Sequence, residues 1–277
     1  MGRFVRLAIS ETGLGISLAF IAGAVNAGGF LLVGHYTSHM SGIIAAVAND
    51  LVLGAFWLAA AGLVALGAFL CGAAVSAALI NWGRRNPRHH PYAMPLRLEA
   101  VLLLLFGAIG GLLANEAVVV IVIPLLCFLM GLQNATITKI SGTRIRTTHM
   151  TGVVTDLGIE LGKLFYWNRR ILGPDGHFVW ADRAKLRLLA AFLSAFVLGG
   201  VAGALAFTWI GFITTVPLAV TLLLLAQAMI RAERRDTGSG KLPPEPEQFP
   251  PQPTPSSSTL KTSVALGGMT PPAPRAP

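Results

Sequence analysis

The chain has 277 residues, of which 54% are hydrophobic and only 12% are charged, and its formal net charge at pH 7 is +9. Soluble domains carry roughly a quarter charged residues, so this composition argues against a soluble protein and indicates one embedded in a membrane. The two cysteines, Cys71 and Cys127, lie within apolar runs and lack the spacing of a metal site, which favours small core residues.

Six long apolar runs follow one another along the chain. They cover residues 13–34, 57–82, 96–114, 117–137, 186–207 and 210–230. Each run approaches the roughly 20 residues that a helix needs to cross a bilayer. The first is longer than the hydrophobic part of a cleaved signal peptide, so we assign it as a span. The sequence therefore predicts an all-α membrane protein with six transmembrane helices.

Two shorter helical stretches, 40–56 and 150–166, each begin inside the same polar motif. The motif reads TSHMSG at residues 37–42 and TTHMTG at residues 147–152, a spacing of 110 positions. If both stretches crossed the membrane, the chain would have eight spans. If neither crosses fully, six spans remain and every Lys and Arg faces one side. The positive-inside rule favours the second arrangement.

Three full spans in each half make the second half begin on the opposite side of the membrane from the first. We therefore expect an inverted 3+3 repeat, with two half-spanning or broken helices that approach each other near the bilayer centre. The predicted parts are a basic cytoplasmic N-terminus (1–12), two membrane repeats (13–115 and 116–232) and a disordered Pro/Ser/Thr-rich cytoplasmic tail (233–277).

The repeated motif predicts a solute site. A helix that begins within the membrane leaves its first N–H groups without partners unless the site is buried in protein or lines a water-filled cavity. Gly42 and Gly152 would let a backbone or a solute approach closely. Two helix N-termini that face one point favour an anion or a polar solute. The expected N-cap residues are Ser41 and Thr151, or Ser38 and Thr148.

Further polar residues at membrane depth are candidates for the same site. Asn26, Gln133 and Asn134 precede the two motifs, and they either line the solute site or hydrogen-bond the exposed backbone of the entry loops. His39 and His149 are interpreted as imidazoles that contact the solute or support the structure. No cysteine or carboxylate spacing completes a metal site around them, so we expect neither a metal nor a cofactor.

Asp156 is the acidic residue that stands out, because it falls inside the second short stretch while the equivalent position holds Ala46. A lone carboxylate within the membrane is typical of ion coupling. The alternative is a carboxylate paired with a nearby Arg or with a capped backbone. Both interpretations of Asp156 remain open at this point.

The segments GAVNAGGFLLVG and HMSG, followed by FLMGLQNATITKISGTRIRTTHMTGVVTDLG, resemble the YoaK family of bacterial multi-pass inner-membrane proteins. The resemblance covers about residues 13–232 and is most specific in the second half. The first half departs from it, since the family usually has Asp where Asn26 stands and Asn where Ile43 stands. The resemblance implies a fold and a location in the cell (inner) membrane, but no substrate. The one-sided basic residues predict that both termini are cytoplasmic.

The favoured function is transport of a small polar or anionic solute bound between two half-helix N-termini. The alternatives are a channel-like pore and a membrane scaffold that binds a partner. No Ser/His/Asp set, phosphate-binding glycine loop or pair of catalytic carboxylates occurs, so we do not expect an enzyme. The expected partners are the lipid bilayer and the solute. Topology and anionic lipid explain the positive charge without nucleic acid, and the sequence leaves a homo-oligomer open.

Overall fold

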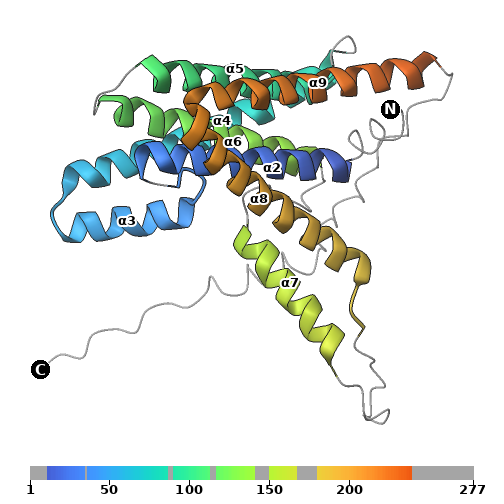
Figure 1. Cartoon of the computed structure of the whole chain (residues 1–277), viewed down its shortest axis with the longest axis horizontal. Helices are drawn as coiled ribbons and strands as arrows, with labels where there is room; N and C mark the ends of the chain where they lie inside the picture. The colour runs from blue at the N-terminus through green and yellow to red at the C-terminus, as the bar shows by residue number, and fades with distance from the viewer. Residues whose placement is uncertain are drawn as a thin grey trace, which may run out of the picture. The chain divides into compact units, whose positions relative to one another are not determined.

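The computed structural model describes residues 11–34, 36–86, 90–112, 117–140, 150–166 and 180–238. Every regular element in these ranges is helical, as the sequence predicts (Figure 1). The elements are α2 (Glu11–Val33), α3 (Met40–Val52), α4 (Phe56–Arg85), α5 (Ala93–Leu112), α6 (Ala117–Ile140), α7 (Met150–Phe165), α8 (Arg183–Ile210), the 3-10 helix η1 (Gly211–Thr214) and α9 (Thr215–Gly238).

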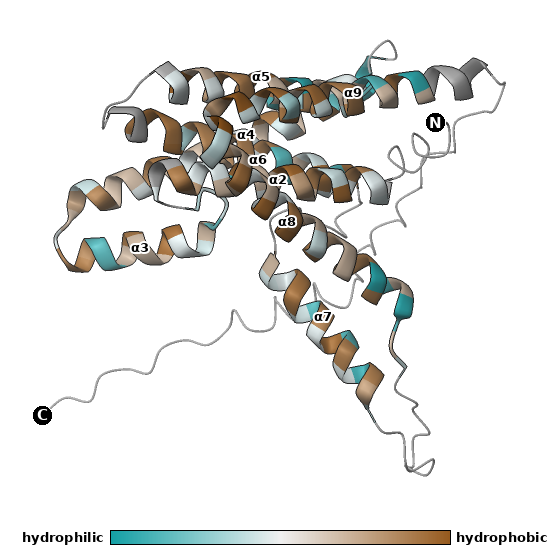
Figure 2. Cartoon of the chain, in the orientation of Figure 1, coloured by the Kyte–Doolittle hydropathy of each residue, from teal (hydrophilic) through white to brown (hydrophobic). Residues whose placement is uncertain are grey.

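Within the described ranges, five apolar stretches are long enough to cross a membrane. They are Thr12–Leu31, Phe56–Arg85, Ala93–Gly111, Val120–Ile140 and Arg183–Ala232. The last stretch contains α8 and most of α9, which η1 separates. Figure 2 shows that hydrophobic residues dominate the long helices. The chain is therefore an integral membrane protein, and the count of six spans stays a prediction.

Large apolar side chains are exposed along the long helices, which a water-soluble protein would bury. Trp57 of α4 is 76% exposed, Leu198 of α8 is 62% exposed and Leu224 of α9 is 59% exposed. Exposed apolar surface of this extent marks contact with another apolar phase. For helices of this length, that phase is the hydrocarbon of the bilayer.

The buried core lies where α2, α5, α6 and α9 meet. Its largest fully buried side chains include Phe106 of α5, Met130 of α6 and Leu18 of α2. Two helix pairs make the most extensive contacts, α2 with α8 and α4 with α6, while α3 packs on α4 and α7 packs on α8. Each short helix is thus held by the long helix that follows it in the chain.

Helices α2 and α8 cross at a point where each of them has a glycine. Phe20 and Gly23 of α2 lie against Phe196 and Gly199 of α8. A methyl group at Gly23 would overlap the carbonyl oxygen of Phe196, and one at Gly199 would overlap the carbonyl oxygen of Phe20. The two backbones therefore touch directly, which only a residue without a side chain allows.

The pair α4–α6 repeats this geometry with its own Phe-x-x-Gly segments. A methyl group at Gly72 of α4 would overlap the carbonyl oxygen of Phe128, and one at Gly131 of α6 would overlap the carbonyl oxygen of Phe69. The four segments (20–23, 69–72, 128–131 and 196–199), called the Phe-x-x-Gly crossings below, thus make two reciprocal contacts of the same kind.

The short helix α3 begins at Met40 and α7 begins at Met150, the starts that the repeated motif predicts. α3 ends at Val52, and Gly54 with φ +74° turns the chain into α4. A helix rises about 1.5 Å per residue, so Phe69, thirteen residues after Phe56, lies about 20 Å along α4. Met40 lines a cavity together with Phe69, so α3 begins close to the mid-length of α4.

Substitution at the crossings tests their contribution to stability. We expect Gly72→Ala and Gly199→Ala each to destabilise the protein by about 1–3 kcal/mol, because the new methyl group forces two backbones apart. Gly67→Ala is the matched control, since a methyl group at this α4 glycine meets no atom within 4 Å. The control should be neutral or stabilising by up to about 1 kcal/mol. Thermal unfolding of the purified variants measures the difference, and equal effects at 67 and 72 would contradict the close crossing.

Candidate functional site

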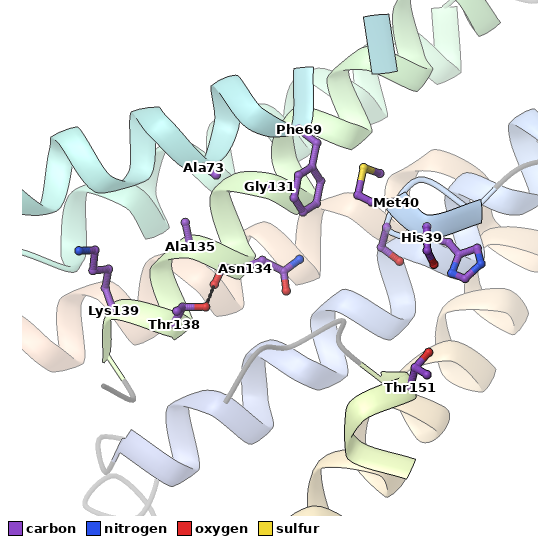
Figure 3. Close-up of a pocket in the computed structure, with 12 residues that line it drawn as sticks. His39, Met40, Phe69, Ala73, Gly131, Asn134, Ala135, Thr138, Lys139 and Thr151 are labelled. Atoms are coloured by element: carbon purple, nitrogen blue, oxygen red, sulfur yellow. Dashed lines mark hydrogen bonds between the residues drawn. The ribbon is translucent and has the colours of Figure 1, made fainter. Parts of the chain in front are cut away.

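A cavity of about 660 Å³ lies between the starts of the two short helices and the middle of the bundle (Figure 3). Residues 38–41 at the start of α3, Phe69 and Ala73 of α4, and Thr151 of α7 form part of its lining. The α6 face completes it with Gly131, Asn134, Ala135, Thr138 and Lys139. One cavity therefore receives residues from both copies of the repeated motif.

The lining is polar on the side of α3 and α7, and it is positive at the end of α6. Ser41 and Thr151 are exposed hydroxyl residues in the first turns of their helices, and Lys139 lies in the last turn of α6. None of the described lining residues is acidic. The electrostatic character of the cavity is thus suited to a neutral polar molecule or an anion.

Asn134 is buried at this wall of the cavity, where its side-chain amide donates to the carbonyl oxygen of Met130 at 2.8 Å. Thr138 in turn donates to the carbonyl oxygen of Asn134 at 2.6 Å, the dashed contact in Figure 3. Both bonds run back along α6 to the residue four positions earlier. The polar groups of this wall are therefore held in fixed directions by their own helix.

The start of α3 differs from the predicted capping. His39, rather than Ser38 or Ser41, occupies the N-cap position, and no side chain accepts a hydrogen bond there. Ser41 lies within the first turn, while Ser38 donates its hydroxyl to Oδ1 of Asn26 at 3.0 Å. The N-cap prediction for the first motif is wrong, because Ser38 is used to hold the entry loop on α2. Asn26 is therefore a partner of the entry loop.

Gly42 has a local role that the sequence did not indicate. A methyl group at this position would overlap the imidazole ring of His39, so the missing side chain leaves room for that ring. The imidazole is exposed and lines the cavity. The first N–H groups of α3 thus lie beside His39 without a side-chain cap.

Gln133 is not among the residues that line the cavity, although Asn134 beside it is. Its side chain is fully buried and its amide nitrogen donates to Glu99 Oε1 at 2.7 Å and to the carbonyl oxygen of Leu18 at 3.4 Å. Gln133 therefore belongs to a second polar group, between α2, α5 and α6. Sequence reasoning missed Glu99, and the signal that identifies it is an acidic residue inside the apolar run 96–114.

The remaining candidates lie on α7 or just before it. Gly152 is half-buried but does not line the cavity, and His149 lies outside the described residues. Oδ2 of Asp156 is 3.5 Å from Nζ of Lys185 on α8, and the carboxylate is 47% exposed. The nearby basic partner is thus a Lys where the sequence indicated an Arg. Ion coupling through Asp156 stays a prediction.

Glu160 forms the stronger link between α7 and α8. Its side chain is only 3% exposed, and its carboxylate accepts from Nζ of Lys163 at 2.9 Å and from the backbone N–H of Asp182 at 2.9 Å. The bond from Lys163 is the main cause that lowers the pKa of Glu160, followed by the bond from Asp182. Asp182 itself caps α8 by accepting from the N–H groups of Ala184 and Lys185.

Within the described ranges, no group of three or more His, Cys, Asp and Glu side chains is placed to hold a metal ion.

Several long apolar helices with exposed apolar side chains define a multi-pass integral membrane protein. Residues 14–228 match a family described as a protein of unknown function (DUF1275), and the chain belongs to this family. This finding confirms the resemblance to the YoaK family, since YoaK is a DUF1275 member. Searches of curated proteins and of solved structures each returned no match.

The two carboxylates of α7 should differ in their effect on stability. We expect Glu160→Gln to lower the melting temperature clearly at pH 7, because it breaks a buried ion pair and a bond that holds the start of α8. Asp156→Asn should have little effect, since its partner is 3.5 Å away and half-exposed.

The effect of Glu160→Gln on the melting temperature should depend on pH. A lowered pKa means that the Glu160 carboxylate stabilises the fold above its ordinary value of 4.5, and that this contribution is lost as the pH falls through the folded-state value. The gap in melting temperature between wild type and Glu160→Gln should therefore shrink in acid. A gap that is constant from neutral to acidic pH would contradict the role of the charge.

Proposed function

We propose that this protein transports a small polar or anionic solute, which binds in the cavity between the starts of α3 and α7. The observation that carries the proposal is that both copies of the repeated motif line one cavity, Ser41 and His39 from the first and Thr151 from the second. A site built from two related halves of a membrane protein is the arrangement found in many transporters.

The charges of the cavity favour an anion over a cation. Each helix N-terminus carries roughly half a positive charge, and the start of α3 has no side-chain cap that would neutralise it. Lys139 adds a full positive charge, and the described lining offers no carboxylate against it. Hydroxyl groups of Ser41 and Thr151 supply further donors of the kind that bind oxyanions.

The packing of the long helices supports an inverted repeat. In such a repeat α2 corresponds to α6 and α4 corresponds to α8, so the contact α2–α8 becomes the contact α6–α4. Those are the two most extensive helix contacts. The Phe-x-x-Gly crossings follow the same relation, since 20–23 and 128–131 are 108 positions apart and 69–72 and 196–199 are 127 positions apart. α3 on α4 and α7 on α8 form the third related pair.

The proposed topology places all basic helix ends on the cytoplasmic side. The basic residues of the described helices lie at the ends of α4, α6, α7 and α9 and near the starts of α5 and α8: Arg84, Arg85, Lys139, Lys163, Arg231, Arg234, Arg235, Arg97, Arg183, Lys185 and Arg187. If the six long helices cross alternately, all these ends share one face, with both termini beside it. The positive-inside rule makes that face cytoplasmic.

Single-cysteine labelling tests this topology. After Cys71 and Cys127 are replaced, cysteines at positions 86, 143, 175 and 250 should react only when the reagent reaches the cytoplasm. Cysteines at positions 115 and 209 should react with an impermeant reagent from outside. Labelling of position 86 or 143 from outside would restore the arrangement with eight spans and would remove the inverted repeat.

Anion binding tests the function itself. Purified protein should gain thermal stability with at least one of phosphate, sulfate, nitrate or a small carboxylate, because a ligand that binds only the folded state raises the melting temperature. We expect Lys139→Gln to weaken this binding at least tenfold. Arg85→Gln removes the same charge from an exposed helix end outside the cavity and should bind as the wild type does.

Flux in proteoliposomes then separates a transporter from the alternatives. A transporter gives saturable uptake of the bound anion that is accelerated by the same anion on the other side. Flux that does not saturate would indicate a channel-like pore. If no anion or small polar metabolite stabilises the protein, or if the two variants bind alike, the transporter proposal is wrong and a scaffold role is favoured.

A further inference from the structure

A second polar site lies in the core, apart from the cavity, where Glu99 of α5 meets Gln133 of α6. Both side chains are fully buried, and the Gln133 amide nitrogen donates to Glu99 Oε1 at 2.7 Å. The same nitrogen is 3.4 Å from the carbonyl oxygen of Leu18 on α2. Three long helices therefore converge on one carboxyl–amide pair.

Each member of the pair has one buried oxygen without a hydrogen-bond partner. These atoms are Oε2 of Glu99 and Oε1 of Gln133. Buried polar atoms are nearly always hydrogen-bonded, so two such atoms in one pair require an explanation. Both are acceptors as long as Glu99 is ionised, so the pair lacks a donor.

No positive side chain within the described ranges supplies what is missing. On the helices that meet in this core, the basic residues whose side chains the structure describes are Arg97 on α5, Lys139 on α6 and Arg231 on α9, and all three are exposed. None of them forms an ion pair with Glu99, and the described part of α2 contains no Lys, Arg or His. A carboxylate buried in this way without a counter-charge is strongly disfavoured.

The pair lies at a similar distance from the nearer end of each of its three helices. Glu99 is six residues from the start of α5, and both Gln133 and Leu18 are seven residues from the nearer ends of their helices. At about 1.5 Å per residue, each position lies about 9–11 Å from the nearer end of its helix. In all three helices the residue of the pair thus lies nearer to the midpoint of the helix than to its end.

We propose that Glu99 binds a proton and that Gln133 is the partner that holds the protonated form. The proton adds to Oε2 of Glu99 and turns this acceptor into an O–H donor, which Oε1 of Gln133 accepts. The amide N–H to Glu99 Oε1 is already present, so a carboxylic acid and an amide then exchange two hydrogen bonds. Release returns the proton to water and leaves the carboxylate.

A proton fits this pair better than a metal ion does. The Gln133 amide nitrogen lies within reach of both Glu99 Oε1 and the Leu18 carbonyl oxygen, where an oxygen-coordinated cation would otherwise sit. That nitrogen is a donor and repels a cation. One proton satisfies both remaining oxygens at once. The use of this proton to drive solute movement rests on the proposed transport function, whereas the binding of the proton does not.

Infrared spectroscopy of the full-length protein in lipid nanodiscs tests the proposal without any solute. Wild type should show, at neutral pH, the C=O stretch of a protonated carboxyl that disappears only in alkali. Glu99→Gln should lose this band, and Asp156→Asn, which removes an exposed carboxylate, should keep it. A wild type without the band, or a band that persists in Glu99→Gln, overturns the proposal.

Two further variants test the partner. The exchange Glu99→Gln with Gln133→Glu keeps one acid and one amide in the same place, so the band should return even if the single variant is poorly folded. Gln133→Leu keeps the acid but removes its partner, so the band should shift to higher frequency. An unshifted band in Gln133→Leu, or an exchange variant that folds without the band, would overturn the pairing.

Sodium is tested in the same experiment. The band should be the same in sodium chloride and in choline chloride at constant pH. Loss of the band on addition of sodium would mean that a metal cation displaces the proton, and it would overturn the assignment of a proton site.

Discussion

The rest of the structure depends on the direct contact of helix backbones at the Phe-x-x-Gly crossings. Helices in a bilayer gain little by hiding apolar side chains from one another, because lipid chains are just as apolar. Close backbone packing is therefore what holds α2 to α8 and α4 to α6. Since α3 is carried by α4 and α7 by α8, these two contacts also decide where the polar motifs lie.

The cavity is a direct product of one of these crossings. Phe69 and Gly131 belong to the α4–α6 contact, and both also line the cavity. Because the two helices touch at that level, the start of α3 can be enclosed by protein on the α4–α6 side. If the start of α3 at His39 lies within the membrane, as the proposed topology has it, its uncapped N–H groups need protein or water around them in place of lipid. The α4–α6 crossing thus supplies the protein surface that the uncapped start of α3 needs beside it.

Sequence patterns predicted the features that depend on local chemistry. The apolar runs gave the long helices, and the motif gave the starts of α3 and α7 at Met40 and Met150. Capping at Ser38 failed because the hydroxyl bonds Asn26, which is twelve residues away in sequence. Glu99 was missed because one carboxyl hardly changes the mean hydropathy of a run of leucines. Its meaning depends on Gln133, a partner on another helix that no local pattern identifies.

The two polar sites are joined by one rigid element, because Gln133 and Asn134 are neighbours on α6. Successive residues of a helix point about 100° apart, so Gln133 reaches Glu99 while Asn134 faces the cavity. A rotation or shift of α6 that reshapes the cavity therefore also moves Gln133 relative to Glu99. If Glu99 binds the proposed proton and donates it to Gln133, movement of α6 would change the strength of that bond, so protonation and the position of α6 would affect each other. In the proposed transporter, α6 alone would connect the proton site to the solute cavity.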